Sequence, residues 1–258
     1  MSYTDLLLDR DGPVAILTLN RPKQINALSM NLMGECIAAL KEVAADREVS
    51  VLVVRGAGKH FCAGHDISEM RDSDLPGYRL TFDTCTRMMN AIQALPQPVI
   101  AQVHGVATAA GCQLVATCDL AVAEEGARFA TPGVKIGLFC STPMVPLARA
   151  VGRKKAMEML LTGDFVDAHE ARACGLINKV VSTAALEDET LALARRISAA
   201  SPLVLGLGKQ AFYTQLDMPQ PQAYAHAKEV MSLNAMAADA REGMGAFLEK
   251  RPPHWQGR

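Results

Sequence analysis

Two stretches of this chain have residue types and spacing suited to binding an anion through the backbone. Residues 59–66 and 103–119 each end an apolar run in a turn of small residues, after which apolar residues recur with helical spacing. A helix that starts in this way presents backbone N–H groups without intrahelical partners, and its dipole adds partial positive charge at the same end. Small residues such as Gly111 let a ligand approach that backbone closely. We therefore expect the backbone N–H groups of His65 and Ala110 to form an oxyanion hole for a carbonyl oxygen.

Composition limits the classes of function. The 258 residues, half of them hydrophobic, suit one large domain or a domain with a tail. A formal net charge of −1 provides no broad basic surface, so we expect neither nucleic acid nor a membrane as a partner. The seven cysteines form no C-x-x-C pair, which favours buried thiols in a reducing compartment. The first five residues have neither the basic nor the apolar segment of a targeting sequence, and we expect a cytoplasmic protein.

Strands and helices must position the two turns. Apolar runs predict short strands, and amphipathic stretches between them predict helices, one of them starting after a Ser29 cap. The polar segment 72–77 predicts a mobile loop. Residues 182–250 contain no strand pattern and predict only helices, interrupted at Ser201-Pro202 and before Pro219. The fold class is therefore α/β, with a mixed core followed by a helical region. The strands are predicted at residues 14–19, 49–55, 99–103, 119–123, 129–131 and 176–181.

Six segments along the chain form a recognisable set of motifs. In chain order they are Asn20-Arg-Pro-Lys-Gln-Ile-Asn-Ala-Leu28, Phe61-Cys-Ala-Gly-His-Asp66, Gly105-x5-Gly111-Cys-Gln-Leu, Cys118-Asp119, Phe129-Ala-Thr-Pro and Ala246-Phe-Leu-Glu-Lys-Arg251. Together they resemble the enoyl-CoA hydratase/isomerase (crotonase) superfamily over nearly the whole chain. Within that superfamily, residues 107–116 and 129–143 look most like the branch of enoyl-CoA hydratase domain-containing protein 3.

The resemblance implies a crotonase-like spiral of ββα repeats over residues 1–195 and a helical C-terminal trimerisation region over residues 196–258. It implies a homotrimer or homohexamer acting on an acyl-CoA. Coenzyme A would enter as part of the substrate, so no separate cofactor and no metal is expected. The oxyanion donors again fall on His65 and Ala110. The coenzyme would lie near the backbone of residues 63–67, and the residues expected to bind it are Lys23, Ala63, Gly64, Asp66, Ile67, Gly111, Gly133 and Lys250.

This sequence departs from the family pattern at both proton-transfer positions. Family hydratases use two glutamates there, and the matching residues are Gln113 and Gly133. Neither can carry a proton, so a general acid–base contribution of roughly 10²–10⁴ in rate has lost its usual source. A backbone oxyanion donor, typically worth about 10²–10³, survives such changes. We therefore expect an enoyl-CoA hydratase/isomerase-type enzyme that stabilises a thioester enolate but hydrates its substrate slowly.

Two alternatives stay open. The chain is either a noncatalytic acyl-CoA-binding or regulatory homologue, or it catalyses another acyl-CoA reaction such as thioester hydrolysis or decarboxylation. Tight binding of crotonyl-CoA without hydration, together with a gain of hydration on Gln113→Glu with Gly133→Glu, would favour the binding protein. Release of free CoA or CO₂ would reveal the other reactions.

Individual site candidates have more than one role open to them. Gln113 either orients water or is a polar helix residue bonded to backbone, and Ser141 either holds water or stabilises a turn. The His65 ring either faces the pantetheine or a phosphate of the coenzyme or, as we expect, faces solvent. Cys140 is either an acid or nucleophile with a depressed pKa or, as we expect, an inert buried thiol. We expect Asp66 to cap a helix rather than to act as a base.

Other candidates are basic or apolar. Basic loop residues either reach the coenzyme's phosphates or are simply solvated, and a set of apolar residues either lines an acyl tunnel or belongs to the core. The basic residues are Arg21, Lys23, Lys59, Lys250 and Arg251, and the apolar ones are Met88, Met89, Phe139 and Met144.

Overall fold

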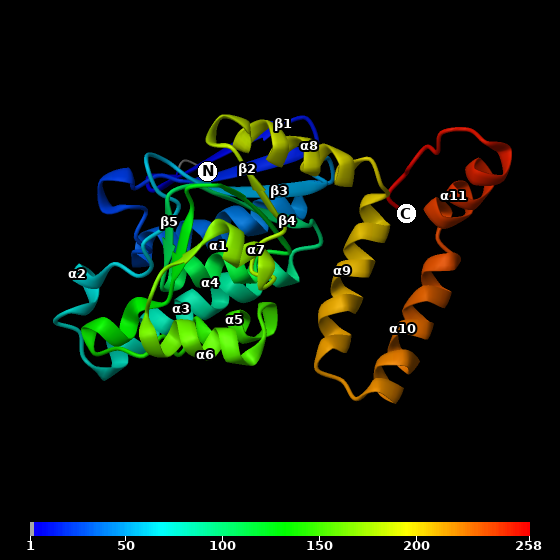
Figure 1. Cartoon of the computed structure of the whole chain (residues 1–258). Helices are drawn as coiled ribbons and strands as arrows, with labels where there is room; N and C mark the ends of the chain where they lie inside the picture. The colour runs from blue at the N-terminus through cyan, green and yellow to red at the C-terminus, as the bar shows by residue number, and fades with distance from the viewer. Residues whose placement is uncertain (1–2) are drawn as a thin grey trace.

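The computed structural model describes residues 3–258; Met1 and Ser2, which begin the segment considered for targeting, lie outside the described residues. Within the described residues, nine strands form two sheets. Figure 1 shows their arrangement. The strands are β1 (Leu6–Asp11), β2 (Val14–Leu19), β3 (Val51–Gly56), β4 (Val99–Val103), β5 (Val106–Thr108), β6 (Leu120–Glu124), β7 (Arg128–Ala130), β8 (Val166–Asp167) and β9 (Lys179–Val181).

The larger sheet has the order β1-β2-β3-β4-β6-β9 and is parallel except for the β1–β2 hairpin. The smaller sheet has the order β5-β7-β8. The α-helices are α1 (Met30–Ala45), α2 (Ile67–Met70), α3 (Leu75–Ala94), α4 (Ala110–Thr117), α5 (Met144–Ala150), α6 (Arg153–Thr162), α7 (Ala168–Ala173), α8 (Leu186–Ser198), α9 (Pro202–Leu216), α10 (Gln220–Ala235) and α11 (Ala238–Glu249); 3-10 turns cover Pro22–Gln24, Pro132–Ile136 and Thr183–Ala185.

Both faces of the larger sheet are buried, because alternate residues of its strands enter two different clusters. Leu17, Leu52 and Ala101 pack with α1, α3 and α4 on one face, whereas Ile16 and Val53 pack against α8 on the other. Burial on both faces explains why these strands read as nearly continuous apolar runs rather than alternating ones. The sheet therefore provides a rigid base from which the turns after β3 and β5 project.

Several local predictions are confirmed. Ser29 caps α1 and Asp66 caps α2, and within the described residues the chain from 182 to 250 has no strand. The mobile loop predicted at 72–77 is wrong. The Asp74 side chain accepts a hydrogen bond from Gly77 N–H at 2.9 Å and caps α3, which already begins at Leu75.

Three strands were missed: β1, β5 and β8. All three are short or polar, so their residues show no apolar pattern typical of a strand. They are strands because neighbouring strands pair with them. Among residues 3–258, no single helix is long and apolar enough to span a membrane, although the bent pair Thr183–Ser198 and Pro202–Leu216 meets those two criteria together.

Helices α9, α10 and α11 stand beside the core as an arm (Figure 1). The arm is joined to the core by a buried ion pair: the Lys209 ammonium lies 2.7 Å from the Asp119 carboxylate and donates to the carbonyls of Ile92 and Gln97. Asp119 also accepts from Val99 N–H and from the Tyr213 hydroxyl. Burial lowers the pKa of Lys209, and the Asp119 charge opposes that fall.

The 195/196 boundary expected between core and C-terminal region falls inside α8, whose residues still pack on the sheet. The first helix of the arm is α9, so the domain division stays a prediction.

The ion pair leads to a stability prediction. Asp119→Ala leaves the Lys209 ammonium buried without its counter-charge, and we expect a loss of about 3–5 kcal/mol in the free energy of unfolding. Urea denaturation measures this change. Glu48→Ala, which removes an exposed partner of Arg10, is the control and should change unfolding little. Equal effects of the two substitutions would contradict the role given to the buried pair.

Candidate functional site

The two turns expected to bind an anion are joined by hydrogen bonds between their own backbones. Cys62 N–H donates to the Val106 carbonyl at 3.1 Å, and the Cys62 carbonyl accepts from Thr108 N–H at 2.9 Å. The Thr108 hydroxyl adds a bond to the Ala63 carbonyl at 2.9 Å. These contacts bring residues 62–65 beside the start of α4, so the two turns lie together, as predicted from the sequence.

The amides of His65 and Ala110 have no internal acceptor. Within residues 3–258, neither N–H donates a hydrogen bond, and Ala110 is the first residue of α4. Gly64 has φ +100°, and a Cβ on it would lie 2.8 Å from the Ala109 Cβ and 3.0 Å from the Ala110 nitrogen. Glycine therefore both permits this backbone conformation and leaves the Ala110 amide uncovered.

The residue before α4 is held in a strained conformation. Ala109 has φ 49° and ψ −117°, a region that costs a non-glycine residue of order 1–3 kcal/mol. Its N–H donates to the Ala130 carbonyl at 2.9 Å, so β7 helps to hold the turn. Strain that the surrounding structure maintains is typical of ligand-binding and catalytic turns.

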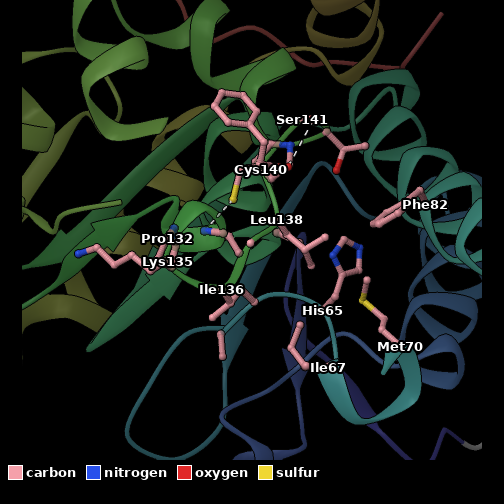
Figure 2. Close-up of a pocket in the computed structure, with 18 residues that line it drawn as sticks. His65, Ile67, Met70, Phe82, Pro132, Lys135, Ile136, Leu138, Cys140 and Ser141 are labelled. Atoms are coloured by element: carbon pink, nitrogen blue, oxygen red, sulfur yellow. Dashed lines mark hydrogen bonds between the residues drawn. The ribbon is translucent and has the colours of Figure 1, made fainter. Parts of the chain in front are cut away.

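A cavity of about 530 Å³ adjoins the two turns (Figure 2). Residues of the turns line one part of it, and the loop 132–143 lines another. Its walls are mainly apolar, with Ile67 and Met70 from α2, Phe82 from α3 and Leu138 from the loop. An apolar cavity with a few backbone donors at one end suits a ligand that has an acyl chain and one carbonyl.

The ring of His65 belongs to this cavity rather than to the solvent. It packs edge-on against Phe82, with the ring centroids 5.5 Å apart, and Figure 2 shows it beside Met70 and Leu138. The expectation of a solvent-facing ring is therefore wrong, because α3 supplies an aromatic side chain that covers it. Burial lowers the pKa of His65 to about 4, so the ring is neutral at neutral pH.

No carboxylate is found among the described residues that line the cavity. Besides His65, the titratable groups there are Lys135 and Cys140. The Lys135 amine pairs with Asp164 at 2.8 Å. Cys140 accepts a hydrogen bond from Gly133 N–H at 3.3 Å, and burial raises the pKa of its thiol, as expected for an inert cysteine.

The backbone around Gly133 has no room for a side chain. A Cβ at this position would overlap the carbonyl oxygen of Leu138 and lie 2.8 Å from the Cys140 sulfur. The Leu138 N–H closes the loop by donating to the Gly133 carbonyl at 2.9 Å. Gly133→Glu therefore disturbs the loop, and it cannot serve as the gain-of-function test suggested from the sequence alone.

Gln113 and Ser141 lie in different surroundings. Gln113 is only 4% exposed and lies outside the cavity lining, and its Oε1 is buried without a partner in the described part of the chain. Ser141 lines the cavity, and its hydroxyl donates to the Phe139 carbonyl at 3.3 Å.

The residues expected to bind coenzyme A are only partly brought together. Ala63, Ile67 and Gly133 line the cavity. Gly64 and Gly111 shape the turns instead: a Cβ on Gly111 would overlap the Cys62 carbonyl. Lys23 and Lys250 are exposed and lie outside the lining.

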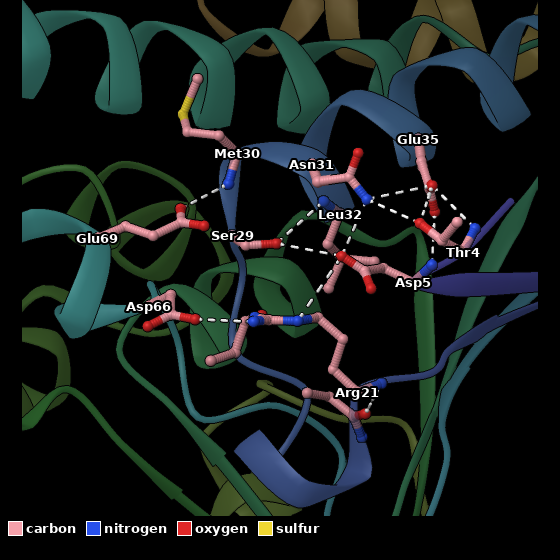
Figure 3. Close-up of polar contacts among 12 residues, drawn as sticks. Thr4, Asp5, Arg21, Ser29, Met30, Asn31, Leu32, Glu35, Asp66 and Glu69 are labelled. Carbon is pink, nitrogen blue, oxygen red and sulfur yellow. Dashed lines mark hydrogen bonds and ion pairs between the residues drawn. The ribbon is translucent and has the colours of Figure 1, made fainter.

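A polar network supports the first turn from behind (Figure 3). Arg21 pairs with Asp66 at 2.9 Å and donates to the Ala27 carbonyl at 2.6 Å. Hydrogen bonds from Ser68, together with Arg21, hold the pKa of Asp66 below its usual range. The Arg21 side chain is thus bonded to this turn. Its position does not support the alternative that it contacts a phosphate of the coenzyme.

The apolar candidates divide between cavity and core. Phe139 lines the cavity, whereas Met88 and Met89 belong to the core and Met144 lies outside both. Sequence reasoning missed Phe82 and Leu138. No local pattern distinguishes them, because α3 and the loop 132–143 meet only in the folded chain.

Comparison with known proteins identifies the family of the chain. The enoyl-CoA hydratase/isomerase family model matches residues 9–258, and the chain belongs to that family. The chain is 47% identical over 252 residues to the mitochondrial enoyl-CoA hydratase domain-containing protein 3 of Danio rerio, with 96% of this chain and 86% of that protein covered.

Solved structures show the same fold. An enoyl-CoA hydratase from Mycobacterium smegmatis is 51% identical with a TM-score of 0.96, covering 98% of this chain and 99% of that one. Human enoyl-CoA hydratase domain-containing protein 3 is 42% identical with a TM-score of 0.95, covering 98% and 100%. The protein therefore has the crotonase fold predicted from its motifs.

The predicted cytoplasmic location is contradicted by these relatives. The curated proteins named enoyl-CoA hydratase domain-containing protein 3 are mitochondrial by name. The prediction was wrong because it used the composition of the first five residues, which describes only where this sequence begins.

The crowding at Gly133 leads to a second prediction. Gly133→Ala forces the Leu138 carbonyl to move, and we expect a loss of about 1–3 kcal/mol in the free energy of unfolding. Gly34→Ala in α1 is the matched control, because a Cβ there meets nothing within 4 Å and helix propensity favours alanine by about 0.5–1 kcal/mol. Thermal unfolding of both variants makes the comparison. A Gly133→Ala protein as stable as the wild type would contradict the crowding argument.

Proposed function

We propose that this protein binds an acyl-CoA or enoyl-CoA and stabilises the enolate of its thioester between the backbone N–H groups of His65 and Ala110. The observation that carries the proposal is the pair of unpartnered amides at one end of an apolar cavity. Two fixed donors at a developing oxyanion stabilise it without reorganisation at the moment of reaction. Family membership supports the choice of a thioester as the ligand.

Slow hydration is part of the proposal. With Gln113 outside the cavity lining and Gly133 in a crowded loop, neither position offers a group that transfers a proton to or from water. We therefore propose an enolate-forming enzyme whose hydratase activity is weak. Coenzyme A enters with the substrate, and no other cofactor is part of the proposal.

A noncatalytic acyl-CoA-binding protein is the second candidate. It is favoured by the lack of any carboxylate among the described residues of the cavity. Both the enolate-forming enzyme and the noncatalytic protein would bind the thioester carbonyl through the two amides. Only the enzyme would break a carbon–hydrogen bond.

We also propose a homotrimer or homohexamer. Along the arm, α10 and α11 expose large apolar side chains, and Phe247 and Leu248 are 82% and 79% exposed. Exposed apolar groups of this size favour burial against another subunit. Lys250, next to them, would then reach the coenzyme of a neighbouring subunit.

Hydrogen bonds from the two amides to the carbonyl predict that a thioester binds more tightly than the matching thioether. Butyryl-CoA should bind about 10- to 100-fold more tightly than the thioether S-butyl-CoA, because each of two hydrogen bonds contributes about 0.5–1.5 kcal/mol. Isothermal titration measures both dissociation constants on the unmodified protein. Free CoA is the control for binding through the coenzyme alone. Equal affinity of the thioester and thioether would refute an oxyanion hole at these amides.

A further inference from the structure

The ring of His65 lines the cavity, and the proposed oxyanion hole uses only the backbone of this residue. Within residues 3–258 neither of its nitrogens has a hydrogen-bond partner, and only Nε2 is fully buried. A neutral imidazole has one N–H donor and one lone pair. Nε2 is therefore closed to a ligand, and Nδ1 is the ring nitrogen that is not fully buried. A buried polar group without a partner costs stability, and each such group in a native structure calls for an explanation.

Covalent geometry places this ring close to any carbonyl held by the backbone of the same residue. The ring nitrogens lie within roughly 6 Å of the residue's own amide nitrogen. An oxyanion sits about 2.7–3.1 Å from its donors. His65 and Ala110 line the same cavity, so a thioester whose carbonyl is held by their amides lies in the cavity that the His65 ring also lines.

We infer that the His65 imidazole is the group that removes a proton from the α-carbon of the bound thioester and returns it. This inference rests on the proposed function and adds the proton-transfer residue to it. The α C–H bond breaks, its electron pair forms the enolate, and the proton bonds to Nδ1. The enolate oxygen is held by the amides of His65 and Ala110. Return of the proton to the α-carbon restores the thioester and the neutral ring.

The electrostatics of the cavity suit this transfer. Because burial lowers the pKa of His65 to about 4, the neutral ring has about the basicity of an ordinary carboxylate, whose reference pKa is about 4. Proton transfer creates an imidazolium beside an enolate, and the attraction of these opposite charges is strong in an apolar cavity.

The other polar side chains of the cavity are less suitable. Lys135 is an ammonium paired with Asp164, so it has no lone pair to accept a proton. The Cys140 thiol has a raised pKa and accepts from Gly133 N–H. The Ser141 hydroxyl has no neighbouring base and donates to the Phe139 carbonyl.

Deuterium exchange into butyryl-CoA tests the inference. This saturated thioester has no double bond to hydrate, so loss of its α-proton signal in D₂O, followed by proton NMR, reports only carbon–hydrogen bond breaking. Wild-type protein should catalyse the exchange, and His65→Gln should lower its rate by about 10²–10⁴ while the dissociation constant of butyryl-CoA stays nearly the same. His169→Gln, an exposed histidine on α7, is the matched control and should exchange at the wild-type rate.

The pH profile gives a test that needs no variant. A neutral imidazole of low pKa makes the exchange rate level between pH 5.5 and 8, because the ring is already unprotonated throughout. A thiolate of Cys140 would instead make the rate rise about tenfold per pH unit, since its pKa is raised. His65→Ala should recover part of the exchange rate when free imidazole is added.

Each outcome separates the two proposals. Undiminished exchange in His65→Gln, or a rate that climbs with pH, overturns the role of the ring but leaves the oxyanion hole standing. Wild-type protein that binds butyryl-CoA and exchanges no deuterium also overturns the inference, and it favours the noncatalytic candidate. Failure of the wild-type protein to bind butyryl-CoA overturns the proposed function itself.

Discussion

The proposed oxyanion hole depends on one constraint: two backbone segments must lie side by side while the amide of His65 and the amide of Ala110 both stay without an internal acceptor. The reciprocal bonds of Cys62 with Val106 and Thr108 bring the segments together. These bonds use the neighbours of His65 and Ala110 rather than those residues themselves. The absence of a side chain on Gly64 then keeps the Ala110 amide uncovered. The larger sheet and the Arg21–Asp66 pair hold this arrangement from behind.

The cavity beside the amides combines an apolar wall with very few titratable groups. The described lining has no carboxylate. At Gly133 the loop 132–143 leaves no room for one, because the Leu138 carbonyl and the Cys140 sulfur occupy the space next to this residue. What is left is a neutral imidazole packed against Phe82. The only charged side chain of the described lining is Lys135, and it is paired with Asp164.

The C-terminal arm shows how a helical region can be attached to a core and still expose apolar surface. Lys209, Asp119 and Tyr213 fix α9 against the end of α4 and the start of β4 through buried polar contacts. Such contacts determine orientation, because a displaced helix would leave a charge unpaired. Further along, α10 and α11 contribute no fully buried apolar side chain except Ala246. Helix α9 is thus fixed to the core, whereas α10 and α11 expose apolar side chains. This difference is the physical basis for proposing subunit contacts at α10 and α11.

Local chemistry was enough to predict much of this protein. The caps Ser29 and Asp66, the apolar runs of the larger sheet and the small-residue turns at His65 and Ala110 were readable because each depends on a few adjacent residues. The family and its fold followed from the same motifs. Tertiary structure alone decided the rest. The His65 ring is covered by Phe82, Arg21 is held by Asp66, Lys209 is paired with Asp119, and no side chain fits at Gly133, because each of these depends on a neighbour distant in the chain or on loop closure. Sequence spacing determines which groups a turn presents, but only packing determines which of them remain free.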